Sequence, residues 1–94
     1  MIPAVAELVA EYDEGVWSKG DFFQRASDLV SRYPVQAVVD AMPDEHREEF
    51  VTWMRETYDN DVSADDYIMI GRDDREELRQ RLPILRAWFR QTAQ

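Results

Sequence analysis

The chain has 94 residues, of which 45% are hydrophobic, and its 20 Asp and Glu against 11 Lys and Arg give a net charge of −9. This length fits a single domain over residues 1–94, and the absence of cysteine excludes disulfides and thiolate chemistry. The negative field disfavours nucleic acid and membrane lipid as partners, and no apolar run reaches the roughly 20 residues that span a bilayer, so we expect a cytoplasmic protein.

The first segment predicts a helix over about residues 3–14, since its apolar residues recur at steps of three and four. Pro3 suits the first helical position and Gly15 a C-terminal stop. Glu7 and Glu11 interrupt the apolar residues and the start carries no basic side chain, which argues against a signal peptide.

A second helix follows after a short connection, so the two helices should form an antiparallel hairpin. Either Ser18 or Asp21 can cap the second helix. Pro34 ends it, because the residue before a proline is pushed away from helical geometry. Trp17 stands between two glycines in the connection and is expected to be buried at the open end of the hairpin.

Two prolines divide the middle of the chain. Pro34 is followed by a short third helix in "PVQAVVDAM", and Pro43 starts a fourth in "PDEHREEFVTWMRETYD". The helix dipole favours the acids that cluster in the first turns of the fourth helix. We expect the inner stripe of this helix to consist of His46, Phe50, Trp53, Met54 and Thr57.

The last helix is expected to begin after Asp73, whose spacing to Glu76 is that of a capping box. Pro83 should kink this helix, or break it into two pieces near Leu82. The apolar stripe of the helix comprises Leu78, Leu82, Leu85 and Phe89. An arginine row beside the stripe comprises Arg75, Arg79, Arg86 and Arg90. Such arginines pair with neighbouring carboxylates, which we favour over a nucleic-acid-binding helix.

Strand signals are missing, because alternation with a period of two never extends beyond four residues. The predicted fold class is therefore all-α, a compact bundle of four to five helices that begins with an antiparallel helical hairpin.

The acidic stretch "DNDVSADDYIMIGRDD" spans residues 59–74. Oxygen-bearing residues alternate in it as in the first half of an EF-hand calcium loop: Asp59, Asp61, Ser63 and Asp65. That loop also needs a glycine where this chain has Ala64 and a bidentate Glu where it has Ile70, so we expect no calcium site. The apolar residues 67–70 are then either core beneath the last helix or a surface covered by another chain.

Candidate catalytic groups are sparse. His46 and Glu49 can offer two metal ligands on one helix, but a catalytic zinc site needs a third protein ligand and nothing in the sequence supplies one. The three glycines stand at helix ends, and no serine lies in a nucleophile-elbow context. We therefore expect no enzyme, no cofactor and no metal site.

The pattern favours a small acidic, non-catalytic protein-binding module, such as an immunity-type or inhibitor protein that docks on a basic effector. Carboxylates would steer the association and an aromatic anchor would hold it. Charge lies beside apolar side chains in the acidic stretch, which predicts a protein-binding surface at Asp61, Asp65, Asp66, Tyr67 and Met69.

In size, acidity and helical character the chain resembles the colicin-type immunity proteins, which carry acids and tyrosines on one helical face. The resemblance would put Asp65, Asp66 and Tyr67 in that place. It extends to these general properties and to no alignable motif. Two alternatives stay open: a structural subunit or homodimer in which another chain covers residues 67–70, and a nucleic-acid mimic.

Overall fold

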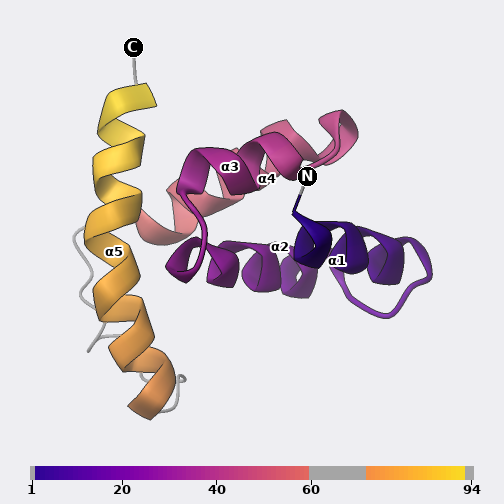
Figure 1. Cartoon of the computed structure of the whole chain (residues 1–94), viewed down its shortest axis with the longest axis horizontal. Helices are drawn as coiled ribbons and strands as arrows, with labels where there is room; N and C mark the ends of the chain where they lie inside the picture. The colour runs from indigo at the N-terminus through magenta and orange to yellow at the C-terminus, as the bar shows by residue number, and fades with distance from the viewer. Residues whose placement is uncertain (1, 60–71, 93–94) are drawn as a thin grey trace.

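The structure, a computed structural model, describes residues 2–59 and 72–92, with side chains in the second range from residue 75 onward. Its helices are α1 (Pro3–Asp13), α2 (Lys19–Asp28), the 3₁₀ turn η1 (Leu29–Ser31), α3 (Val35–Ala41), α4 (Asp44–Tyr58) and α5 (Arg72–Thr92). Within these ranges there is no strand, which confirms the predicted all-α bundle. α1 and α2 form the hairpin, and α5 stands across one end of the bundle in contact with η1, α3 and α4 (Figure 1).

The helices begin and end near the glycine, proline and capping residues of the sequence. Gly15, just after α1, has a φ of +83°, a left-handed conformation that favours glycine and stops the helix. Ser18 caps α2, because its Oγ accepts a hydrogen bond from the backbone N–H of Asp21 at 3.2 Å. Pro34 and Pro43 directly precede α3 and α4, as predicted, but the second helix does not run to Pro34: α2 ends at Asp28 and is followed by the 3₁₀ turn η1.

A side chain of α4 bonds the backbone carbonyls at the C-terminal end of the short α3. Arg47 donates from Nε to the carbonyl of Val39 at 3.1 Å and from a terminal nitrogen to the carbonyl of Met42 at 2.8 Å. These carbonyls lie at the end of α3, where backbone donors run out, although the Val39 carbonyl also accepts the backbone N–H of Met42 at 3.2 Å. Arg47 therefore fixes the angle between α3 and α4.

α5 differs from its prediction in two respects. It already includes Arg72 and Asp73, so it begins earlier than a cap at Asp73 would place it. It also runs unbroken through Pro83, and the predicted break near Leu82 is wrong. Pro83 removes one backbone hydrogen bond, but Leu82 and Leu85 on either side are both buried in the same core, which keeps the helix continuous.

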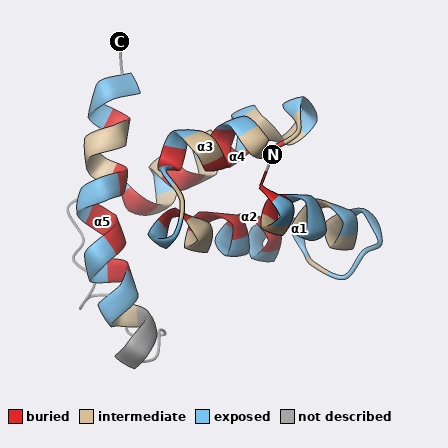
Figure 2. Ribbon diagram, in the orientation of Figure 1, coloured by how far each residue is buried: buried red, intermediate tan, exposed pale blue. Residues whose placement is uncertain are grey.

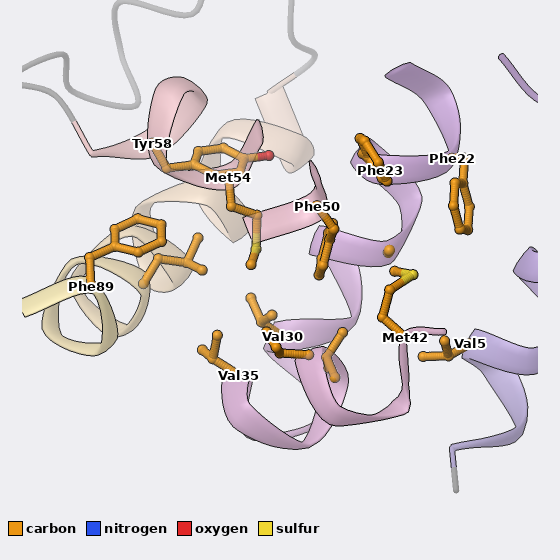
Figure 3. Packing of buried hydrophobic residues seen from close by; sticks show 14 of the residues in the cluster. Val5, Phe22, Phe23, Val30, Val35, Met42, Phe50, Met54, Tyr58 and Phe89 are labelled. Carbon is orange, nitrogen blue, oxygen red and sulfur yellow. The ribbon is translucent and has the colours of Figure 1, made fainter. Parts of the chain in front are cut away.

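The core is made by one face of each helix (Figures 2 and 3). Phe22 and Phe23 of α2 lie beside each other, and Phe23 reaches Phe50 of α4 with ring centroids 5.6 Å apart. The predicted stripe of α5 is buried throughout, at Leu78, Leu82, Leu85 and Phe89. The predicted stripe of α4 divides: Phe50 and Met54 are buried, while His46, Trp53 and Thr57 are half-buried.

Trp17 is less buried than expected. It is half-buried at the edge of the core, and the guanidinium of Arg25 lies 3.8 Å from the centroid of its ring. The tryptophan thus closes the hairpin on one side, and an arginine of α2 covers the ring as a cation–π partner.

Buried polar groups link α2, α4 and α5. Ser27 is buried and donates its hydroxyl proton to the carbonyl of Gln24 at 2.7 Å, so the Tyr58 hydroxyl, 3.1 Å from Ser27, is the donor in their shared hydrogen bond. Arg81 is only 5% exposed and forms ion pairs with Asp28 at 3.3 Å and with Glu77 at 3.8 Å.

The arginine row of α5 also bonds within the fold. Arg86 donates to the carbonyl of Tyr58 at 3.3 Å, and Arg79 pairs with Glu76 at 2.9 Å. Pairing of α5 arginines inside the protein is what we expected, although the most buried arginine, Arg81, was not in the predicted row.

The Tyr58 hydroxyl makes stability dependent on alkaline pH. Burial raises its pKa above the ordinary value of 10.0, so the unfolded chain loses this proton first. Its contribution to stability is present below about pH 10 and is lost as the pH rises further, by up to about 1.4 kcal/mol per pH unit. Urea unfolding of the native chain and of Tyr58→Phe, near neutral pH and above about pH 10, measures this loss.

At neutral pH, Tyr58→Phe should cost about 1 kcal/mol for the hydrogen bond to Ser27. In alkaline solution the variant should lose less stability than the native chain. An equal alkaline loss in both proteins would contradict the role of Tyr58.

Candidate functional site

The binding surface predicted from the sequence lies outside the described residues. Its members are Asp61, Asp65, Asp66, Tyr67 and Met69, and the structure describes none of residues 60–71. The prediction at these positions therefore stays a prediction, as does the question of whether residues 67–70 are core or interface.

A different acidic surface lies within the described residues. α4 and the beginning of α2 line a groove with a volume of about 580 Å³. Its walls carry one ammonium, that of Lys19, and five carboxylates: Asp44, Glu45, Glu48, Glu49 and Glu56. The rings of Phe23 and Trp53 also line it. We call this surface the acidic groove.

The spacing of the acids along α4 explains why they share the groove. Glu45, Glu49 and Glu56 recur at steps that keep side chains on one helical face, with Glu48 beside them. The helix dipole favours only the acids of the first turn, whereas Glu56 lies in the last turn, where negative charge is disfavoured. Like charges four residues apart, as in Glu45 and Glu49, also repel. This face of α4 therefore needs a counter-charge.

Lys19 supplies part of that counter-charge. Its Nζ lies 2.8 Å from Oε2 of Glu49, and both side chains remain about half exposed. Hydrogen bonding and charge attraction between the two raise the pKa of Lys19 and lower the pKa of Glu49. Lys19 is the first residue of α2, where the dipole disfavours a cation. Lys19 thus occupies an unfavourable end of its helix, and the pair with Glu49 across the groove offsets this cost.

The apolar part of the acidic groove is aromatic. Phe23 is buried, while Trp53 is half-buried and contacts Phe23 at a centroid distance of 6.1 Å and Tyr58 at 5.8 Å. These contacts hold the Trp53 ring in place on its inner side. Gly20 lines the groove beside Lys19, and a Cβ built there would meet nothing within 4 Å, so the wall at this point is open.

A second groove, of about 410 Å³, lies between α1 and η1. Glu7 and Glu11 face Arg25 and Arg32 across it. Asp28 and Glu77 also line it, but both pair with Arg81, so two guanidiniums match the two remaining carboxylates and this groove has little preference for a ligand of one charge. It is the weaker candidate for a binding site.

Neither a metal site nor a membrane segment is found among the described residues. No group of three potential ligands gathers there. Glu49 is held by Lys19, while His46 packs edge-on against Tyr12 and Phe22 with its Nε2 3.6 Å from a carboxylate oxygen of Glu45. No helix in the described ranges is long and apolar enough to cross a bilayer.

Comparison of the chain with protein-family models, with curated proteins and with solved structures gives no match. The assignment of a site therefore depends on the geometry and charge of these residues.

The sequence did contain one signal for the acidic groove. The dipole accounts for acids at the start of α4 but not for Glu56 at its end, so the full acidic face pointed to something beyond helix stability. No such signal existed for Lys19, Gly20 and Phe23, because they lie in another helix and reach the groove only through tertiary packing.

The link between Lys19 and Glu49 can be tested by titration. In Lys19→Gln, the pKa of Glu49 should rise toward its ordinary value, because both the hydrogen bond and the positive charge are lost. NMR observation of the Glu49 side-chain carboxyl against pH measures this change. The urea midpoint near neutral pH should hardly move, since an exposed ion pair contributes little to stability. A large drop in the midpoint would show that the pair is structural.

Proposed function

We propose that this protein is a non-catalytic binding module that docks on a basic protein partner, and that the acidic groove is part of the contact surface. The observation that carries the proposal is the combination of five carboxylates with two aromatic rings in one groove. Charged groups steer association and discriminate between partners, while aromatic side chains anchor interfaces.

Exposure of the groove acids supports recognition as their role. Glu45, Glu48, Glu49 and Glu56 are all exposed. Exposed carboxylates act on a cationic partner over distances of about 8 to 10 Å at physiological salt. Below them, Phe23 and Trp53 offer apolar contact once the partner has arrived. Charge for encounter and apolar area for retention thus occupy the same surface.

The finer form of the proposal is an inhibitor or immunity-type protein that covers a cationic cleft of its target in the cytoplasm. The net charge of −9 favours a basic target and repels the phosphates of nucleic acid. The buried links between α2, α4 and α5 support this form, because a firmly packed bundle presents a preorganised surface.

Charge reversal in the groove tests the proposal. Glu48→Lys with Glu56→Lys should remove the partner that the native chain captures from a lysate of its own cells at low salt. Its association rate with the purified partner should fall at least about tenfold, and the rate should depend less on salt. The matched control is Glu7→Lys on α1 with Glu14→Lys just after it, which changes the net charge equally at exposed positions outside the acidic groove.

Three outcomes would contradict this assignment. If the control variant loses the partner to the same extent as the groove variant, only the overall charge of the protein matters for binding. If Asp65→Lys with Asp66→Lys removes the partner and the groove variant does not, the interface is assigned to residues 59–74 instead. If the native chain captures only a second copy of itself, and salt does not change this association, the result would favour the homodimer.

A further inference from the structure

We infer that the acidic groove receives an arginine side chain of the partner, with its guanidinium over Trp53, and that Lys19 competes with this arginine for the carboxylates. The inference rests on the proposed function and adds the chemical group that the groove recognises. Three features of the described residues support it.

The first feature is that the groove already holds a cation. The ammonium of Lys19 lies 2.8 Å from Glu49 in an exposed ion pair that joins residues 30 positions apart. Exposed pairs of this kind exchange readily, because each partner is nearly as well solvated by water. Within the described residues, Glu48 and Glu56 have no cationic partner. The groove thus binds one positive group and retains carboxylates for another.

The second feature is the position of Trp53 among the acids. Glu49 precedes it by four residues and Glu56 follows it by three, so a carboxylate stands about one helical turn away on each side. A cation placed over the indole face would lie between two negative charges. Gly20, across the groove, leaves open space where another residue would have a side chain.

The third feature is that arginines of this protein already pack against two of its aromatic rings. Arg25 lies 3.8 Å from the centroid of Trp17, and Arg55 lies 5.3 Å from the centroid of Phe89. Trp53 has no such arginine among the described residues. A guanidinium is planar, stacks on indole and offers five donors in a fork that fits carboxylates, whereas an ammonium is a compact point charge. The groove therefore suits arginine better than lysine.

NMR titration of the full chain with short peptides tests the inference. The probe is acetyl-Gly-Gly-Arg-Gly-Gly-amide, compared with the peptides in which Lys or neutral citrulline replaces Arg. The indole N–H signal of Trp53 should shift with the arginine peptide, with a dissociation constant on the order of 1 mM. The indole signals of Trp17 and Trp88 serve as internal controls and should stay in place. The lysine peptide should bind at least about threefold more weakly, and the citrulline peptide should cause no shift.

Two variants separate competition from simple charge. Lys19→Gln should tighten binding of the arginine peptide by about two- to fivefold, because the competing cation is gone. Arg32→Gln removes the same charge from the other groove and should leave the affinity unchanged. Glu56→Gln should weaken binding at least about threefold. Equal shifts with the arginine and citrulline peptides, or equal tightening in Lys19→Gln and Arg32→Gln, would overturn the inference.

The experiments distinguish a wrong arginine inference from a wrong proposed function. If charge reversal in the groove removes the protein partner but the arginine peptide does not move the Trp53 signal, the arginine inference is wrong and the binding function stands. If the peptide binds but the groove reversal leaves capture of the partner intact, the groove recognises arginine and the proposed interface is wrong.

Discussion

Burial of one face of α4 is the constraint on which the rest of the structure depends. Phe50, Met54 and Tyr58 are buried in that face, and α4 contacts α2, α3 and α5. Phe23 of α2 reaches Phe50 from one side, while Arg86 of α5 donates to the carbonyl of Tyr58 from the other. Arg47, on α4 itself, satisfies the end of α3. Without α4, the hairpin and α5 would share little common core.

The acidic groove is the other side of the same helix. Packing of the inner face fixes how the acids of the outer face are displayed, so the carboxylates stand on a supported scaffold. Repulsion among them is tolerable because Lys19 pairs with Glu49, Arg47 pairs with Asp44, and water screens the others. The same arrangement leaves negative charge in excess beside Trp53, which a cation from another protein would neutralise.

Most of the fold was readable from local sequence. Pro3, Pro34 and Pro43 marked where helices begin and Gly15 where the first one ends, because their backbone constraints act without help from distant residues. The apolar period of α5 predicted its buried apolar residues correctly. Of the two outcomes predicted for Pro83, a kink or a break, the break does not occur, since a proline weakens a helix locally while burial on both sides of it is a tertiary effect.

The sequence by itself determined the helices, the apolar face of each and the excess of acidic side chains, since these follow from spacing and composition. Only the tertiary structure decided that Ser18 and not Asp21 caps α2, that Arg81 is the arginine buried among the described side chains, and that Lys19 meets Glu49. Such choices depend on which helices meet and at what angle. The groove is the clearest case, because its acids come from one helix while Lys19, Gly20 and Phe23 come from another, and no spacing along the chain records a contact across 30 residues.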